Sequence, residues 1–188
     1  MSAAPKISIS PTYQVRFGGV GGQGIVLLGR MLGKAAALYD GKDAVCTQVY
    51  GPEARGGASR TDVVISNHQI DYPYVTQADV LAVLFQEAYV MFRGCLKPGG
   101  LLIADTELVQ PFDEDSNLHG IPATKIAEEL GTRMAANVVI LGYLVGITDV
   151  VSRESMESAI RSTMKPKIVE LNLKALDAGM RLAQEKGA

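Results

Sequence analysis

Residues 13–24 read Tyr-Gln-Val-Arg-Phe-Gly-Gly-Val-Gly-Gly-Gln-Gly, and a long apolar run, Ile25–Leu38, follows them directly. The alternation in Tyr13–Phe17 predicts a β-strand, and the apolar run is long enough for a buried helix. A strand, a glycine loop and a helix in this order form an anion-binding geometry. Glycines let the backbone approach a ligand closely, and the first N–H groups of a helix have no partner within it.

The spacing Gly19-x-Gly21-x-x-Gly24 matches the dinucleotide-binding fingerprint. That fingerprint also requires an acidic residue about 20 positions further on, at the end of the second strand, to bind a ribose hydroxyl. The expected second strand, Ala44–Val49, has no acid at its end, and Asp43 stands before it. The phosphate-binding half of the motif is therefore present without the ribose-binding half. Alternatively, the glycines only let helix and strand pack closely.

A second glycine-rich stretch, Tyr50-Gly51-Pro52-Glu53-Ala54-Arg55-Gly56-Gly57, follows the second strand. In this order, the two stretches resemble the gamma subunit of the 2-oxoacid:ferredoxin oxidoreductases, and most closely the 2-oxoglutarate type. The equivalent region of single-chain pyruvate:ferredoxin oxidoreductases is a fused gamma domain. The resemblance runs roughly from Tyr13 to Leu182. The two stretches together, in this order, identify the family far more specifically than either stretch alone.

The resemblance implies a fold and a reaction. The fold is α/β, with a Rossmann-like open, mostly parallel sheet, helices on both faces and a helical C-terminal third. The assembled 2-oxoglutarate synthase would decarboxylate a 2-oxoacid oxidatively with coenzyme A, giving an acyl-coenzyme A, carbon dioxide and reduced ferredoxin. Thiamine diphosphate, magnesium and iron–sulfur clusters would reside on alpha, beta and delta-type partner subunits. This chain would be inactive alone, with no catalytic residue, and would help to seat coenzyme A and close the active site.

Both glycine-rich loops are expected to contribute to that coenzyme A site. Loops at the C-terminal ends of parallel strands meet in one crevice, so these two should lie close together. Arg55 would bind a phosphate or carboxylate through its planar guanidinium, and Glu53 would orient the Arg55 side chain. Alternatively, Glu53 and Arg55 would pair with each other and only shape the loop. Tyr50 would pack on the ligand or a neighbouring subunit, and Gln23 would donate a hydrogen bond without neutralising charge. The expected binding residues are Gly19, Gly21, Gly22, Gln23, Gly24, Tyr50, Glu53, Arg55, Gly56 and Gly57.

Composition narrows the class of protein. The chain has 188 residues, 47% of them hydrophobic and 20% charged, and a net charge of −2. These values predict one globular domain, residues 13–188, after a flexible arm, residues 1–12, and they argue against a nucleic-acid partner. The longest apolar run, Val138–Ile147, is about half of a membrane span, and the N-terminus is too polar for a secretory signal. A cytoplasmic location is expected.

Metal and catalytic motifs are missing from the sequence. Cys46 and Cys95 are too few for an ordinary four-thiolate iron–sulfur cluster and should be reduced core residues. His68 and His119 fall in expected loops without a nucleophile or carboxylate at motif spacing. Two other functions stay open: an independent NAD- or FAD-binding oxidoreductase, and a non-enzymatic nucleotide-binding assembly module.

The rest of the chain alternates between strand and helix patterns before becoming helical. Asn137 and Ser152 each precede a helical pattern and are candidate N-caps. The terminal helix, opened by Pro166, has an apolar arc of roughly 220°, wider than the arc of about 100° that a surface helix needs. It should therefore contact a second helix or chain, or lie deep in its own domain. The expected elements after the second loop are strands at 58–66, 79–85 and 101–105 and helices at 86–92, 123–130, 137–147, 153–164 and 166 onward.

Overall fold

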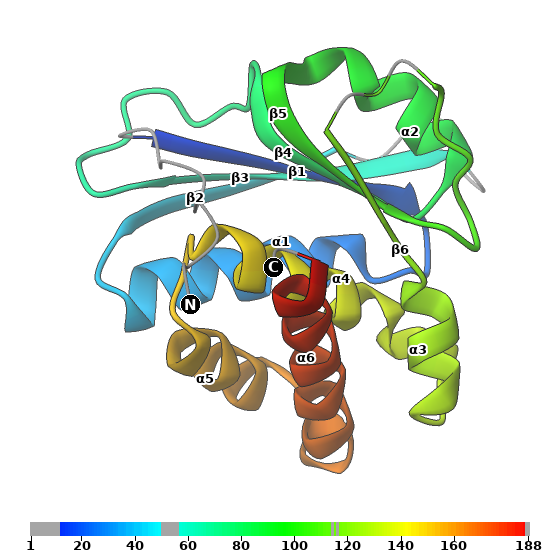
Figure 1. The fold of residues 1–188 in the computed structure, drawn as a ribbon. Coiled ribbons are helices and arrows are strands. Elements are labelled where there is room, and N and C mark those ends of the chain that lie inside the picture. The colour runs from blue at the N-terminus through cyan, green and yellow to red at the C-terminus, as the bar shows by residue number, and fades with distance from the viewer. Residues whose placement is uncertain (1–11, 50–56, 114, 116, 187–188) are drawn as a thin grey trace.

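The computed structural model describes residues 12–49, 57–113, 115 and 117–186. A six-stranded sheet with the order β2-β3-β1-β4-β5-β6 forms its centre (Figure 1). Strands β1, β4, β5 and β6 are parallel, whereas β3 is antiparallel to both β1 and β2. The expected open, mostly parallel sheet is confirmed. The strands are β1 (Thr12–Val20), β2 (Asp43–Val49), β3 (Ala58–Ser66), β4 (Ala78–Val83), β5 (Leu96–Asp105) and β6 (Leu118–Ile121).

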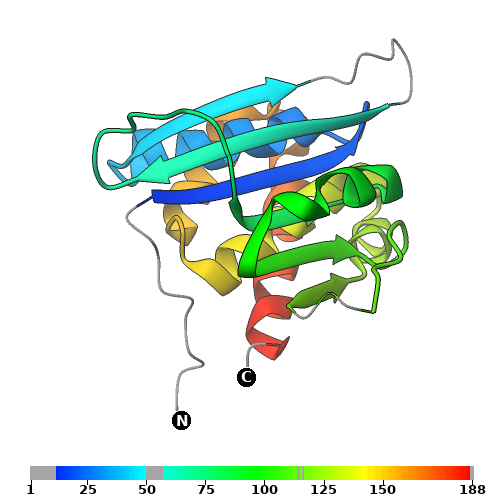
Figure 2. The same cartoon turned by 90° about the horizontal axis from the view of Figure 1, so that it is seen from above.

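Helices cover both faces of the sheet, as expected, but unequally. Helix α2 (Gln86–Phe92) lies on one face, and the other five α-helices of the described chain lie on the opposite face (Figures 1 and 2). Those five are α1 (Ile25–Lys34), α3 (Ala123–Glu129), α4 (Ala136–Thr148), α5 (Arg153–Thr163) and α6 (Pro166–Lys186). None of the helices that the structure describes is both long and apolar enough to cross a bilayer.

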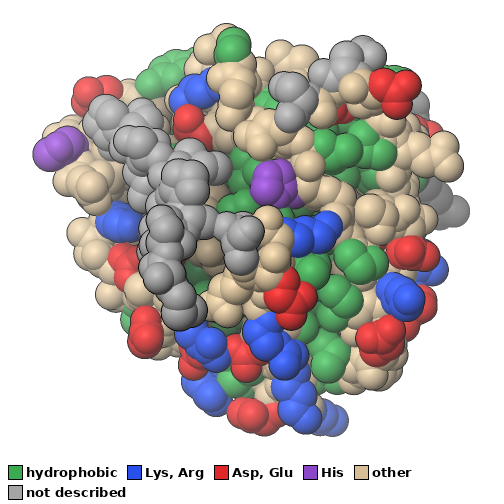
Figure 3. Space-filling view, viewed as in Figure 1, with side chains coloured by type: hydrophobic (Ala, Val, Ile, Leu, Met, Phe, Trp, Pro, Cys, Tyr) green, Lys and Arg blue, Asp and Glu red, His purple; other side chains and the backbone are tan. Residues whose placement is uncertain are grey.

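Helix α4 is apolar on all sides because it is enclosed between the sheet and α6. Close approach of the two helices depends on glycine: a Cβ on Gly142 would lie 2.2 Å from the Leu176 carbonyl oxygen, and one on Gly179 would lie 2.1 Å from that of Val139. This packing buries the apolar stripe of α6, while Ile168 remains 46% exposed. Charged side chains gather on the outer surface of α6 (Figure 3). The broad apolar arc therefore contacts a helix of the same chain.

Several local features differ from expectation. The apolar run after the glycine loop is α1 followed by a π-helical segment, Ala35–Tyr39. Strand β5 begins at Leu96, five residues before the expected strand at 101–105. The short edge strand β6 was not anticipated, because its four residues have no apolar alternation. Ser152 caps α5 as expected, since its side chain accepts a hydrogen bond from the backbone N–H of Ser155.

Candidate functional site

The ends of β1 and β4 form the crevice that positions the site. These strands are parallel neighbours, and the helices that follow them, α1 and α2, lie on opposite faces of the sheet (Figure 1). A pair of strand ends with this arrangement is a topological switch point, where open α/β sheets bind ligands. The glycine loop that follows β1 therefore occupies the usual ligand-binding position of such a fold.

The glycines of this loop have two different roles. A Cβ on Gly19 would lie 2.5 Å from Ile25, and one on Gly24 would lie 2.3 Å from Nδ2 of Asn137, so both are required for close packing. Gly21 and Gly22 are exposed, and a Cβ on either would meet no atom within 4 Å. The packing explanation thus accounts for Gly19 and Gly24, and the loop tip at Gly21 and Gly22 is open to a ligand.

The start of α1 offers backbone donors next to this tip. The first intrahelical hydrogen bond runs from the N–H of Leu28 to the carbonyl of Gly24, at 3.1 Å. The three preceding N–H groups, of residues 25–27, therefore have no acceptor within the helix. The first turn contains no acidic residue and has no side-chain cap. The helix end keeps its partial positive charge for an anion.

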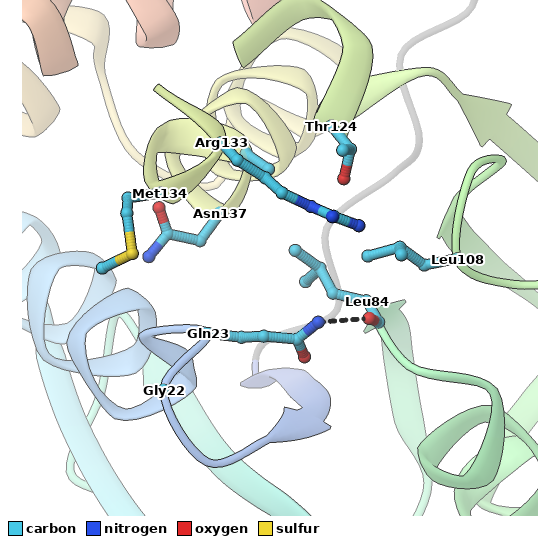
Figure 4. A pocket seen from close by; sticks show the side chains of 9 residues that line it. Gly22, Gln23, Leu84, Leu108, Thr124, Arg133, Met134 and Asn137 are labelled. Atoms are coloured by element: carbon cyan, nitrogen blue, oxygen red, sulfur yellow. Dashed lines mark hydrogen bonds between the residues drawn. The ribbon is translucent and has the colours of Figure 1, made fainter. Parts of the chain in front are cut away.

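Gln23 bridges the two strands of the crevice. The backbone N–H of Val20 donates to its Oε1 at 2.9 Å, and its Nε2 donates to the carbonyl of Leu84 at 2.7 Å (Figure 4). A backbone bond from Leu84 N–H to Gly18 adds a third link, at 3.0 Å. Both ends of the Gln23 amide are engaged within the chain, so its main visible role is to fix the loop against β4.

Two cavities meet at the glycine loop. Their volumes are about 170 and 310 Å³, and both are lined by Gly22, Gln23, Met134 and Asn137. The other side chains lining the larger cavity are mostly apolar, and none of the described residues that line either cavity is acidic. The smaller cavity also includes Leu84, Leu108, Thr124, Arg133 and Ala136, and the larger includes Gly24, Leu27, Thr132, Ala135, Met164, Ile168, Leu171 and Asn172.

Arg133 is a site residue that the sequence did not indicate. It lies in a 3₁₀ turn, Arg133–Ala135, just before α4, and its side chain extends into the smaller cavity beside Thr124 (Figure 4). Within the described chain the guanidinium makes no hydrogen bond or ion pair. The available signal was a basic residue soon after Gly131, which follows α3 and has a φ of 108°. Such a signal is too common to identify a ligand-binding arginine.

Asn137 is also in the site, and its expected role as a helix cap is wrong. Thr132 caps the 3₁₀ turn instead, by accepting a hydrogen bond from the N–H of Met134, and α4 already begins at Ala136. Asn137 is only 5% exposed. Its Oδ1 accepts from the N–H of Val138 at 2.7 Å, whereas its Nδ2 finds no acceptor among the described residues. That free Nδ2 points toward the start of α1 (Figure 4).

The second glycine-rich loop lies largely beyond what the structure describes. Tyr50, Glu53, Arg55 and Gly56 are outside the described residues, and Gly57 is half-buried at the start of β3. The residues flanking the loop are at the same sheet edge as the first loop, since Val20 pairs with Ala58 and Val49 with Arg60. This register agrees with the expectation that the two loops share one crevice.

A dinucleotide site fits this arrangement poorly. Strand β2, which follows α1, is separated from β1 by the antiparallel strand β3. Asp43 pairs with Ser66 at the opposite edge of the sheet from the glycine loop. The described end of β2, at Val49, supplies no acid for a ribose hydroxyl.

The histidines and cysteines lie away from the cavities. His119 pairs with the hydroxyl of Tyr143 at 2.6 Å, and burial, with a smaller contribution from Lys186, lowers the pKa of this histidine. Cys46 and Cys95 are free thiols, and burial raises the pKa of Cys46. In the part of the chain that the structure covers, no group of three metal-binding side chains comes together.

Comparison with known proteins adds the family context. The family model described as pyruvate ferredoxin/flavodoxin oxidoreductase matches residues 14–182. The 2-oxoglutarate synthase subunit KorC of Methanocaldococcus jannaschii is 47% identical over 176 residues, which cover 92% of this chain and 94% of that one.

Solved structures show the same fold. The gamma subunit of a keto/oxoacid ferredoxin oxidoreductase from Geobacter sulfurreducens superposes with a TM-score of 0.85 at 40% identity, covering 94% of this chain and 98% of that one. A 2-oxoglutarate:ferredoxin oxidoreductase from Magnetococcus marinus, solved with 2-oxoglutarate, coenzyme A and succinyl-CoA bound, also has a TM-score of 0.85, at 23% identity. The aligned region covers 94% of this chain and 32% of the larger Magnetococcus chain.

Proposed function

This chain belongs to the pyruvate ferredoxin/flavodoxin oxidoreductase family, and we propose that it acts as the gamma subunit of a 2-oxoglutarate:ferredoxin oxidoreductase and helps to seat coenzyme A there. The observation that carries the subunit assignment is the 47% identity to a 2-oxoglutarate synthase subunit over nearly the full length of both chains. The complex oxidatively decarboxylates 2-oxoglutarate with coenzyme A, giving succinyl-coenzyme A and carbon dioxide, and passes the electrons to ferredoxin.

The partners supply the redox and carbon chemistry. Thiamine diphosphate with magnesium, held on a partner subunit, would supply the carbon chemistry, and iron–sulfur clusters on other subunits would conduct the electrons. The proposed partners are alpha, beta and delta-type subunits of a cytoplasmic complex. The part left to this chain is to bind, orient and cover a substrate.

The geometry of the crevice supports coenzyme A as that substrate. Coenzyme A carries phosphates, and the open loop tip at Gly21 and Gly22 adjoins the uncapped start of α1. The larger cavity beside it is apolar enough to accept the uncharged parts of such a molecule. Arg55 and Glu53, from the second loop, are proposed on sequence grounds to contact the same ligand.

Co-purification and reconstitution test the proposal. A tagged copy of the chain should recover a thiamine-dependent subunit and a ferredoxin-like subunit from its native organism, in fixed proportion. The recovered complex should reduce a dye with 2-oxoglutarate only when coenzyme A is present, and the chain alone should show no turnover. Turnover by a demonstrably single-subunit sample, or a complex that does not require coenzyme A, would contradict the assignment.

A further inference from the structure

The two edges of the sheet differ in their protection. Strand β6 has only four residues, and the amine of Lys186 donates a hydrogen bond to its Gly120 carbonyl. Strand β2 forms the other edge over seven residues, in an uninterrupted antiparallel register with β3 (Figure 2). Residues 44–49, Ala-Val-Cys-Thr-Gln-Val, include no proline, lysine, arginine or acidic residue. Edge strands commonly carry such residues because a bare edge pairs with another strand. The β2 edge is therefore open to pairing.

A second copy of the chain fits this edge by two-fold symmetry. Cys46 is the middle residue of β2, so an antiparallel pair of β2 strands that matches all seven residues sets Cys46 opposite Cys46 of the second copy. We propose that β2 pairs in this way with β2 of a second copy, so that the two sheets become one across a two-fold axis at Cys46. The pairs on either side of the axis are Asp43 with Val49, Ala44 with Gln48 and Val45 with Thr47.

Helix α1 leaves room for the second copy beside β2. Its Gly29 and Gly33 lie against Cys46, since a Cβ on these glycines would lie 3.2 Å and 3.8 Å from atoms of that side chain. Arg30 is exposed and lies three residues before Gly33, on the same side of the helix. The axis at Cys46 passes the middle of this side and sets Arg30 beside Gly33 of the second copy. The two Arg30 charges therefore do not face each other.

Charge complementarity supports a second copy as the occupant. Asp62 already accepts two hydrogen bonds of 2.7 Å from Arg16, so Arg60, at 3.7 Å, is a second cation beside a single carboxylate. The Nε of Arg60 is buried and makes no hydrogen bond in the part of the chain that the structure describes.

The missing carboxylate is available at the start of β2. Asp43 is exposed and forms no ion pair with another described residue. In the proposed pair it lies opposite Val49 of the second copy, which is itself the β3 partner of Arg60. Two strand spacings of about 4.8 Å then separate Asp43 from Arg60 of the second copy on one face of the sheet, a distance that the two side chains span together. The symmetry forms this ion pair twice.

Disulfide cross-linking tests the register. Directly opposite residues of an antiparallel pair have Cα atoms about 4.5–5.5 Å apart, within the reach of a disulfide. Mild oxidation of the full chain, alone and in the assembled complex, should therefore link two copies and double the mass of 20.0 kDa on a non-reducing gel. Both cysteines are free thiols. Cys95→Ser should keep the linked species, and Cys46→Ser should lose it.

Sedimentation velocity measures the pairing without oxidation. The wild-type chain should form a dimer. Asp43→Lys should weaken dimerisation by about tenfold or more, because the symmetry replaces two ion pairs by two repulsive contacts with Arg60. Asp113→Lys is the matched control, since Asp113 is exposed between β5 and β6, at the other end of the sheet, and should dimerise like the wild type. Both variants should fold, because both carboxylates are exposed.

Three results would overturn the inference. One is a wild-type chain that sediments as a monomer, and another is a dimer that Asp43→Lys and Asp113→Lys weaken equally. The third is a disulfide in the complex between Cys46 and a different subunit, which would show that another strand pairs with β2. None of these results changes the requirement of the complex for coenzyme A, which tests the proposed function separately.

Discussion

Replacing Gly21 by Val should impair the use of coenzyme A without destabilising the chain. Gly21 is exposed, its φ is not positive, and a Cβ there would meet no atom within 4 Å. The substitution should therefore change the free energy of unfolding by about 0.5 kcal/mol or less, as for other surface sites. For a chain of this size that corresponds to a shift in Tm of only about 1–2 °C.

The functional effect should be much larger. A valine side chain on the loop tip would hold a phosphate away from the backbone donors at the start of α1. Losing one hydrogen bond to a charged group costs about 1.5–3 kcal/mol, so the KM for coenzyme A should rise by about tenfold to a hundredfold.

Two neighbouring glycines provide the comparison. Gly22→Ala also enters open space, but the φ of Gly22 is 93°, and a left-handed backbone costs a residue with a Cβ about 1–2 kcal/mol. Gly24→Ala would carry the same left-handed penalty, since the φ of Gly24 is 75°, and its Cβ would also displace the Asn137 amide. Overpacking of that kind costs about 1–3 kcal/mol more. Stability should therefore decrease in the order Gly21→Val, Gly22→Ala, Gly24→Ala.

Thermal unfolding of the full chain and kinetics of the reconstituted complex would be measured on the same preparations. An intact complex with Gly21→Val that retains the wild-type KM for coenzyme A would rule out a phosphate contact at the loop tip. A fall in Tm of more than about 5 °C would show instead that the tip is a packing element.

Three further predictions concern the fold. Gly179→Ala should lower the free energy of unfolding by about 3 kcal/mol or more in chemical denaturation, since its Cβ would lie 2.1 Å from a carbonyl oxygen of α4; a loss below about 1 kcal/mol would show that the helices can separate freely. Arg16→Met should cost about 3 kcal/mol, because Arg16 forms a buried ion pair with Asp62 at 2.7 Å and its loss leaves that carboxylate, 3% exposed, with only Arg60 at 3.7 Å; the double variant with Asp62→Leu should recover most of that loss. The folded state lowers the pKa of His119, so it favours the neutral imidazole. The contribution of this histidine to the stability of the folded state is therefore complete above about pH 6.5, and it is lost as the pH falls through the lowered pKa. His119→Gln should therefore reduce the acid-induced drop in Tm, and an unchanged pH profile would count against this histidine.

Elements beside the site follow local signals and could be predicted from the sequence. β1, the glycine loop and α1 need only an alternating strand, positions that tolerate positive φ and an apolar helical run, all within neighbouring residues. The length of α6 and the cap at Ser152 are local in the same sense. β6 escaped prediction because it is a four-residue edge strand, formed only where β5 offers a free edge.

Short-range patterns and two motifs in order were enough to predict the fold class, the family and the glycine loop at the end of β1. The insertion of β3 between β2 and β1, and the use of both ends of the Gln23 amide in the crevice wall, depend on contacts between distant residues and became visible only in the folded chain. The same is true of the presence of Arg133 and Asn137 in the site. Read locally, Asn137 before an apolar run predicts a cap, because capping preference depends on the next three residues. Its position over Gly24 follows from how α4 packs between the sheet and α6. No local sequence pattern predicts such a contact between distant residues.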